Sequence, residues 1–250
     1  MPPDFSLSDK IILQFGGSGH LGRTLSTALH GAGATVVVAG RSPPASDAAP
    51  IAHERVDITV ETSVVALRDR LLAQHGRIDG VVFNAVNRPM TGFDDDLAAW
   101  ESSMKTNATG LFAVARVFGN AMAARRAGSF VAISSIQGMV GANPWLYEGT
   151  SMQTVPDYFF HKAGMLNLVR YLASHYGATG VRVNAVSPGG ILNPERPLPA
   201  EFLARYGKMT MLGRLAEAHE VAGAVVFLLS DAASYITGAN LPVDGGYTAK

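Results

Sequence analysis

Short apolar stretches alternate with longer amphipathic stretches along almost the whole chain. Residues 10–15 and 35–39 are β-branched and apolar, and glycine follows each of them, which is typical of buried strands. Between these two runs, residues 21–32 place four apolar side chains on one face of a helix. The opening of the chain therefore predicts a strand, a helix and a second strand.

The same alternation continues toward the C-terminus. It predicts further strands at 80–83, 128–134, 181–186 and 239–243, and further helices at 61–75, 103–125, 158–176 and 217–229. Strands joined by helices of this length need crossover connections and form a parallel sheet that is covered on both faces. We expect an α/β fold, namely a single-domain Rossmann-type doubly wound parallel sheet over residues 1–250. The Pro-, Ala- and Ser-rich stretch 42–50 is short enough to be a surface loop.

Composition removes several classes of function. Basic and acidic residues number 20 each, so the chain has no global attraction for nucleic acid or an anionic membrane, and we expect neither as a partner. The absence of cysteine excludes disulfides, cysteine-based zinc sites and a thiol nucleophile. The seven histidines lack the spacing of a zinc site, so we expect no catalytic metal.

Neither end of the sequence suggests export. The N-terminus lacks the basic and apolar regions of a signal peptide, and the apolar run at 221–229 is too short to cross a bilayer. Together with the lack of cysteine, this predicts a cytoplasmic protein.

The first candidate for chemistry is a glycine-rich turn between the first strand and the first helix. Gly17, Gly19 and Gly22 satisfy the pattern GxGxxG, which lets a backbone approach a pyrophosphate closely at a helix N-terminus. The alternative is a glycine-rich turn without a ligand. The position of the motif favours a dinucleotide site.

The residues after the second strand bear on which dinucleotide binds. Gly40 stands where an NAD-binding protein has an acid for the ribose hydroxyls, and Arg41 and Ser42 follow it. Arginine can pair with the 2′-phosphate of NADP, so this segment favours NADP. NAD stays possible, because a single arginine here can simply face solvent.

A second candidate is the pair Tyr158 and Lys162, which lie four positions apart and share one face of a helix. Free tyrosine has a pKa of about 10 and is a poor base at neutral pH. A nearby ammonium stabilises the phenolate and lowers that pKa, which allows proton transfer near neutrality. A surface Tyr–Lys pair without function is the alternative.

Taken in order, these features resemble the short-chain dehydrogenase/reductase family. The motifs that carry the resemblance span nearly the whole chain: the glycine loop, Asp57, Phe83-Asn84-Ala85, Asn107, Ser134-Ser135, Tyr158/Lys162, Ser187-Pro188-Gly189-Gly190, Ile236-Thr237-Gly238 and Val243-Asp244-Gly245-Gly246. The resemblance implies an oxidoreductase that transfers hydride between NAD(P) and a small-molecule alcohol or carbonyl compound. It also implies a homodimer or homotetramer.

The resemblance implies roles for four catalytic residues. Tyr158 would be the general acid/base, and Lys162 would bind the nicotinamide ribose and lower the tyrosine pKa. Ser135 would orient the substrate oxygen, while Asn107 would hold a water that links Lys162 to solvent. Ser135 and Asn107 also have purely structural alternatives, as the end of a strand and as a helix residue bonded to backbone.

The resemblance also implies a set of cofactor contacts. In this reading Asp57 caps the adenine, Ile58 offers a backbone contact, and residues 188–191 lie under the nicotinamide. Asp57 could instead simply cap the helix that follows. The full implied set is Gly16, Ser18, Gly19, His20, Leu21, Gly22, Arg41, Ser42, Asp57, Ile58, Asn84, Ala85, Tyr158, Lys162, Pro188, Gly189 and Ile191.

Three departures from the family pattern stand out. Phe15 and His20 replace residues of the usual glycine motif, and Val86 replaces the last glycine of the Asn-Asn-Ala-Gly motif. Ser135 and Tyr158 are 23 positions apart, which is longer than the family usually shows. The added stretch, residues 139–156, links two catalytic positions and could form the substrate wall or pack against a neighbouring subunit.

The polar and aromatic residues of 139–156 suit a polyol or sugar-like substrate. The pattern there resembles that of bacterial oxidoreductases of surface-sugar or flagellin modification. A different class of function is also open, namely a catalytically silent dinucleotide-binding sensor or scaffold. The intact Asn107, Ser135, Tyr158 and Lys162 favour the enzyme.

Overall fold

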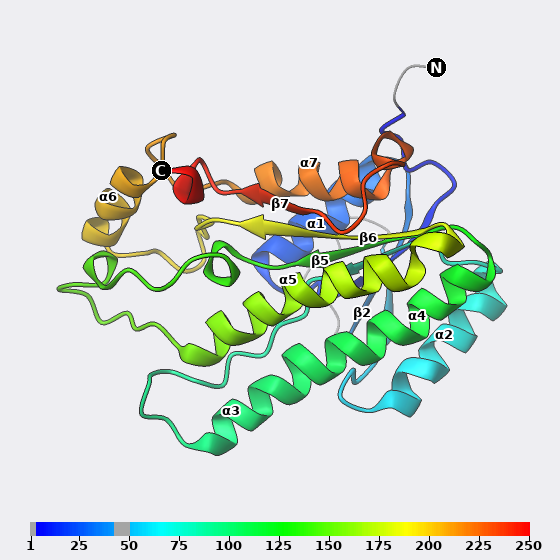
Figure 1. Cartoon of the computed structure of the whole chain (residues 1–250), viewed down its shortest axis with the longest axis horizontal. Coiled ribbons are helices and arrows are strands. Elements are labelled where there is room, and N and C mark those ends of the chain that lie inside the picture. Colours follow the sequence, from blue (N-terminus) through cyan, green and yellow to red (C-terminus); the bar gives the residue numbers. More distant parts are fainter. Residues whose placement is uncertain (1–3, 43–50) are drawn as a thin grey trace.

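Seven parallel strands form one twisted sheet in the order β3-β2-β1-β4-β5-β6-β7 (Figure 1). The computed structural model describes residues 4–42 and 51–250, so most of the loop predicted at 42–50 lies outside it. The strands are β1 (Ile11–Phe15), β2 (Thr35–Gly40), β3 (Ala52–Arg55), β4 (Gly80–Phe83), β5 (Gly128–Ile133), β6 (Val181–Pro188) and β7 (Asn240–Val243).

Helices cover both faces of this sheet. They are α1 (His20–Gly31), α2 (Glu61–His75), α3 (Leu97–Met104), α4 (Leu111–Ala124), α5 (Pro156–Tyr176), α6 (Ala200–Met209) and α7 (Ala218–Leu229). A π-helical turn, η1 (Lys105–Gly110), joins α3 to α4. Short 3₁₀ turns are η2 (Ile136–Gly138), η3 (Pro144–Leu146), η4 (Gly177–Thr179), η5 (Asp231–Ala233) and η6 (Tyr247–Ala249). None of the described helices is both long and apolar enough to span a membrane.

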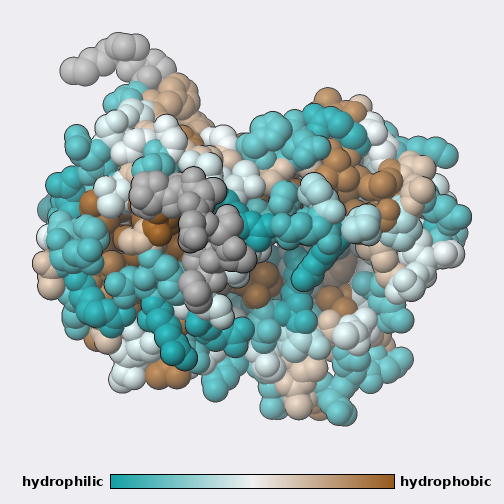
Figure 2. Space-filling view, turned by 180° about the vertical axis from the view of Figure 1, so that it is seen from behind, coloured by the Kyte–Doolittle hydropathy of each residue, from teal (hydrophilic) through white to brown (hydrophobic). Residues whose placement is uncertain are grey.

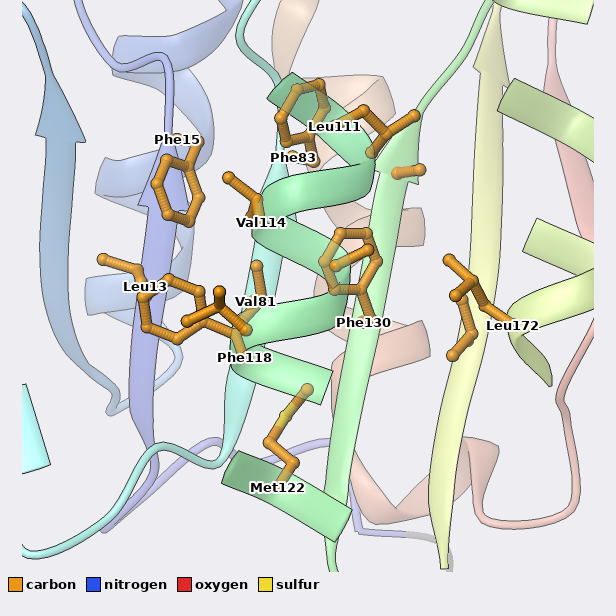
Figure 3. Close-up of a cluster of buried hydrophobic side chains, with 14 of the residues drawn as sticks. Leu13, Phe15, Val81, Phe83, Leu111, Val114, Phe118, Met122, Phe130 and Leu172 are labelled. Carbon is orange, nitrogen blue, oxygen red and sulfur yellow. The ribbon is translucent and has the colours of Figure 1, made fainter. Parts of the chain in front are cut away.

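Alternation along each strand divides the core into two layers. In β1, Leu13 and Phe15 pack with α2, α4 and α5, whereas Ile12 packs with α1 and α7 on the other face. Figure 3 shows the first layer, in which apolar side chains of α4 such as Val114 lie against β1, β4 and β5. Because both faces are buried, the central strands are mostly apolar. The predicted fold class is therefore confirmed.

Three segments differ from the sequence prediction. Strand β3 was not predicted, because its sequence Ala-His-Glu-Arg is mostly polar and only partly buried. The helix expected over 103–125 begins earlier, as α3, and is interrupted by η1 before α4. Helix α6 was not predicted, although Phe202 and Tyr206 give it a buried face. That face packs on Ile136, Leu146 and neighbours in a third, smaller cluster beyond the sheet, so its partners are distant in sequence.

Candidate active site

A cleft opens at the carboxyl ends of the strands, where β1, β4, β5 and β6 all finish. Parallel α/β sheets bind ligands at this edge, next to the point where the strand order reverses. In Figure 1 these ends face the left side, where α6 also lies, and Figure 2 shows the molecule hollowed between the lobe with α6 and the larger sheet part. Its lining runs from Gly19 of the glycine loop to Phe202 and Tyr206 of α6.

The glycine loop is shaped by close backbone contacts. Gly16 has a positive φ of 84°, and a Cβ there would come within 2.6 Å of the Ala85 nitrogen. A Cβ on Gly22 would lie 2.5 Å from the Gly16 oxygen, which keeps α1 tight against the loop. At Gly19 a Cβ would meet nothing within 4 Å. The loop is thus tightly packed against the protein at Gly16 and Gly22 and has free space at Gly19, on the side of the cleft.

The N-terminus of α1 is available to an anion. Its N-cap is Gly19, which has no side-chain cap, and the first turn contains no acidic residue. Free N–H groups and the helix dipole at such an end favour a phosphate. Together with the open space at Gly19, these features fit the pyrophosphate of a dinucleotide. His20 and Leu21 form the first turn, and Ser18 is exposed beside it.

Two polar side chains hold this loop in place. The Asn84 Nδ2 donates to the Gly16 carbonyl at 2.7 Å, which joins the end of β4 to the loop. Gln14, fully buried in β1, donates from Nε2 to the Gly22 carbonyl at 2.8 Å. Sequence reasoning missed Gln14, although a lone polar residue within an apolar strand just before the loop was a usable signal.

Tyr158 and Lys162 come together on α5 as predicted. The Lys162 Nζ lies 5.5 Å from the centre of the Tyr158 ring and donates to the Ile133 carbonyl at 2.6 Å. Lys162 is buried, and desolvation, partly offset by Tyr158, lowers its pKa. Burial alone would raise the pKa of Tyr158, but Lys162, Arg88 and Ser135 favour the phenolate and the net pKa is lowered.

Arg88 is the functional candidate that sequence reasoning missed. Its guanidinium carbon lies 4.6 Å from the centre of the Tyr158 ring, within the range of a cation–π contact. The residue follows β4 and is exposed at the cleft. Arg88 lies just after the Phe83-Asn84-Ala85 motif but is not part of it, and its partner Tyr158 is 70 positions further along the chain, so the local sequence carries no signal of the contact.

Ser135 stands at the end of β5 with its side chain at the cleft. Its Oγ accepts a hydrogen bond from the Gln137 nitrogen at 3.2 Å and so caps η2. The adjacent Ser134 donates to the Lys162 carbonyl at 3.0 Å, which fixes β5 against α5. The structure therefore brings Ser135, Tyr158 and Lys162 to one site.

Asn107 sits in the π-turn η1 with its side chain already engaged. Its Nδ2 donates to the Asn87 carbonyl at 2.7 Å and to the Ser103 Oγ at 2.9 Å, and its Oδ1 accepts from the Asn87 nitrogen at 2.8 Å. Ser103 in turn donates to the buried Asp157 at 2.5 Å. Because both side-chain donors are used, the relay water implied by the resemblance would have to donate to Asn107, at its backbone carbonyl or at the second lone pair of Oδ1.

The residues expected at the adenosine end follow β2 and β3, at one edge of the sheet. Asp57 accepts hydrogen bonds from the Thr59 nitrogen and hydroxyl at 2.9 and 2.8 Å. These bonds lower the pKa of Asp57, and the charges of Arg41 and Lys105 lower it further. Arg41 and Ser42 are exposed, whereas Ile58 is buried. Asp57 therefore bonds within the turn that precedes α2 and does not cap that helix, whose N-cap is Val60 without a side-chain cap.

The segment after β6 is covered by α6. Pro188 ends the strand, the Gly189 nitrogen donates to the Val243 carbonyl at 2.9 Å, and Ile191 forms a bridge with Ala216. The Gly190 nitrogen donates to the hydroxyl of Tyr206, whose pKa burial raises to about 12. The tyrosine therefore acts as a neutral clamp on this segment.

The 139–156 segment is held by α6 and forms one wall of the cleft. Arg205 donates to the carbonyls of Trp145 and Glu148, the first at 3.2 Å. The rings of Tyr147 and Phe202 pack with their centres 5.7 Å apart. Tyr147 and residues 152–155 face the cleft, so this segment lies where a substrate wall was expected.

His161 is a buried neighbour of Tyr158. The two rings meet edge to face with centres 5.2 Å apart. Desolvation, followed by the charges of Lys162 and Arg88, lowers the pKa of His161 to about 3. It is thus a neutral packing residue. Among residues 4–42 and 51–250, no group of three or more acidic or histidine side chains is arranged to hold a metal ion.

Comparison with known proteins places the chain in a family. Residues 18–248 match the family model described as enoyl-(acyl carrier protein) reductase. The cis-4-hydroxycyclohexanecarboxylate dehydrogenase of Sinomonas cyclohexanicum is 36% identical, over 98% of each chain. The chain belongs to the short-chain dehydrogenase/reductase family.

Solved structures agree with this assignment. A short-chain dehydrogenase from Leptospira borgpetersenii with bound NAD+ has a TM-score of 0.89 and 28% identity, covering 96% of this chain and 93% of that one. A gluconate 5-dehydrogenase from Burkholderia cenocepacia, in complex with NADP and tartrate, has a TM-score of 0.88 and 26% identity, covering 99% and 98%. The protein is an NAD(P)-dependent oxidoreductase acting on alcohol and carbonyl groups.

Proposed function

We propose that the protein oxidises a secondary alcohol, or reduces the corresponding ketone, with Tyr158 as general acid/base. The observation that carries this proposal is that Ser135, Tyr158 and Lys162 meet at the cleft, with the Lys162 Nζ 5.5 Å from the centre of the Tyr158 ring, an arrangement that lowers the pKa of Tyr158. When bound, the nicotinamide cofactor accepts or supplies the hydride. In oxidation, the phenolate of Tyr158 takes the hydroxyl proton while Ser135 orients the substrate oxygen.

The ammonium of Lys162, 5.5 Å from the centre of the Tyr158 ring, stabilises that phenolate. Its own hydrogen bond to the Ile133 carbonyl fixes its position, so it need not reorganise during the reaction. Asn107, held by Ser103 and Asn87, would offer its backbone carbonyl or Oδ1 to a water that passes the proton on. In reduction, Tyr158 returns a proton to the developing alkoxide.

For the cofactor, we favour NADP over NAD. Gly40 leaves no carboxylate at the end of β2 for ribose hydroxyls, and Arg41 is exposed there. A comparison of NADPH and NADH affinities in the wild type and Arg41→Ala would decide the point. A clear NADH preference that survives the substitution would contradict this choice.

For the substrate, we favour a cyclic alcohol or a polyol. A named relative acts on a hydroxycyclohexane, and a structural neighbour is a gluconate dehydrogenase. The wall combines the polar Gln153 and Thr154 with the apolar Met152 and Val155, which suits a ring or chain carrying hydroxyl groups. A homodimer or homotetramer and a cytoplasmic location stay predictions.

The decisive experiment is Tyr158→Phe, assayed with NADP+ and NAD+ on cyclohexanol, 4-hydroxycyclohexanecarboxylate, its carboxamide and galactitol. Removing the hydroxyl removes the proton acceptor, so kcat should fall by about 10² to 10⁴-fold. Cofactor affinity, measured by fluorescence titration, should stay unchanged. Equal turnover by the variant would refute the role of Tyr158, and cofactor binding without turnover of any substrate would favour the sensor.

A further inference from the structure

The charges that line the cleft are all of one sign. Among the described residues that line it, Arg88 and Lys162 are charged, and neither aspartate nor glutamate is present. Lys162 is buried and already donates to the Ile133 carbonyl. Arg88 is exposed and forms no salt bridge with any described acidic residue. The cleft thus presents one guanidinium with its charge uncompensated.

The position of Arg88 indicates that its guanidinium binds the substrate and not the cofactor. Its guanidinium lies against the ring of Tyr158, the residue that meets the reacting oxygen. The cofactor pyrophosphate has its own site at the glycine loop and the N-terminus of α1. An anion beside Tyr158 would therefore belong to the molecule whose hydroxyl group reacts there.

We propose that the substrate carries a carboxylate and that Arg88 binds it, which makes Arg88 the residue that selects hydroxy acids over neutral alcohols. This inference rests on the proposed function. The planar guanidinium can form paired hydrogen bonds with a carboxylate. The walls formed by Tyr147, Met152 and Phe202 enclose the carbon skeleton. The substrate is thus held at its anionic end by Arg88 and at its hydroxyl by Ser135 and Tyr158.

Arg88 also stabilises the phenolate of Tyr158, so the test must separate the two effects. The matched substrates are 4-hydroxycyclohexanecarboxylate and its neutral carboxamide, which share shape and reacting hydroxyl. A change in the pKa of Tyr158 alters turnover of both, whereas loss of the carboxylate contact alters the acid alone. The ratio of their kcat/KM values therefore reports the contact.

The wild type should prefer the acid, and Arg88→Gln should lower the acid-to-amide ratio of kcat/KM by about 10- to 100-fold, as expected for charge-assisted hydrogen bonds. Arg88→Lys should retain part of the preference. Arg170→Gln, on an exposed position of the same helix as Tyr158, should leave the ratio unchanged. An equal loss for both substrates in Arg88→Gln would overturn the proposal.

A binding experiment tests Arg88 without any turnover. Cyclohexanecarboxylate has the anion but no hydroxyl, so its binding to the cofactor-loaded protein can be measured by calorimetry. It should bind the wild type and bind Arg88→Gln at least about 10-fold more weakly. Equal binding to both proteins would overturn the inference. Oxidation of cyclohexanol without any preference for acids would also overturn it, yet would leave the proposed function intact.

Discussion

Among the described residues, charged residues are paired at one end of the sheet and unpaired in the cleft at the other end. At the amino ends, Lys10 pairs with Asp231 at 2.8 Å, and Asp79 pairs with Arg77 and Arg125 at 3.0 and 3.3 Å. At the carboxyl ends, the cleft contains two cations and no described acidic residue. At the amino ends charge fixes strand ends, whereas in the cleft it is kept available to ligands, at a cost in desolvation.

The comparison predicts that catalysis and stability respond separately at the two ends, and the largest effect should follow Lys162→Met. Without the ammonium the pKa of Tyr158 rises, so kcat should fall by about 10² to 10⁴-fold at neutral pH. Oxidation needs the phenolate, hence the rise of kcat/KM with pH should move to higher pH. Stability should change little, since removal of a desolvated charge offsets the loss of the hydrogen bond to the Ile133 carbonyl. The pH profile and a urea unfolding curve measure both.

The matched control for that experiment is Lys10→Met at the amino end. It breaks an exposed pair, so stability should change by less than about 1 kcal/mol and kcat should stay constant. If Lys10→Met lowered kcat as Lys162→Met does, the division of charge between the two ends would be wrong.

The next largest effect should follow Asp79→Ala at the amino end. Its carboxylate accepts a hydrogen bond from the Ile11 nitrogen at 2.9 Å and contacts two arginines, so the loss leaves the first residue of β1 unpaired. We expect a loss of about 2 to 3 kcal/mol in the free energy of unfolding, measured in urea. Catalysis should not change. A variant with normal stability and reduced kcat would contradict this assignment.

Features that depend on residues close together in the sequence were predictable, whereas features that depend on distant residues were not. The strand pattern, the glycine loop and the Tyr158–Lys162 pair are local, because their spacing alone places them on a strand end or a helix face. The π-turn at Asn107 left no such trace, since residues 103–125 read as one uninterrupted helix. The six apolar strands were therefore predictable, whereas the polar edge strand β3, helix α6 and the boundaries of the helix at 103–125 were not.

The substrate side was the least predictable part of the site. Arg88 contacts Tyr158 only because β4 and α5 are brought together by the sheet. Likewise, α6 hides its apolar face against Leu146 and Tyr147, which lie more than fifty positions earlier in the chain. Contacts between distant parts of the chain produce no periodic pattern in the sequence. The wall at 139–156 was therefore predicted, but α6, the helix that holds it, was not.

The last prediction concerns His161 and the pH dependence of the stability of the protein. The folded protein keeps His161 neutral down to a pKa of about 3, whereas the unfolded chain takes up its proton below about 6.5. The unfolded state thus binds more protons between these values, and stability falls as pH falls through that window. From pH 6.5 to 5 the loss due to His161 should be about 2 kcal/mol.

His161→Phe should remove that loss and keep the edge-to-face contact with Tyr158, so its unfolding free energy should depend less on pH than that of the wild type. Urea unfolding at pH 6.5 and 5 measures the difference. His30→Phe, at an exposed position of α1, is the control and should leave the pH dependence as it is. Equal slopes in wild type and His161→Phe would mean that His161 titrates normally in the folded protein. The burial of this site and the charges of Lys162 and Arg88 would then act on His161 more weakly than the structure indicates.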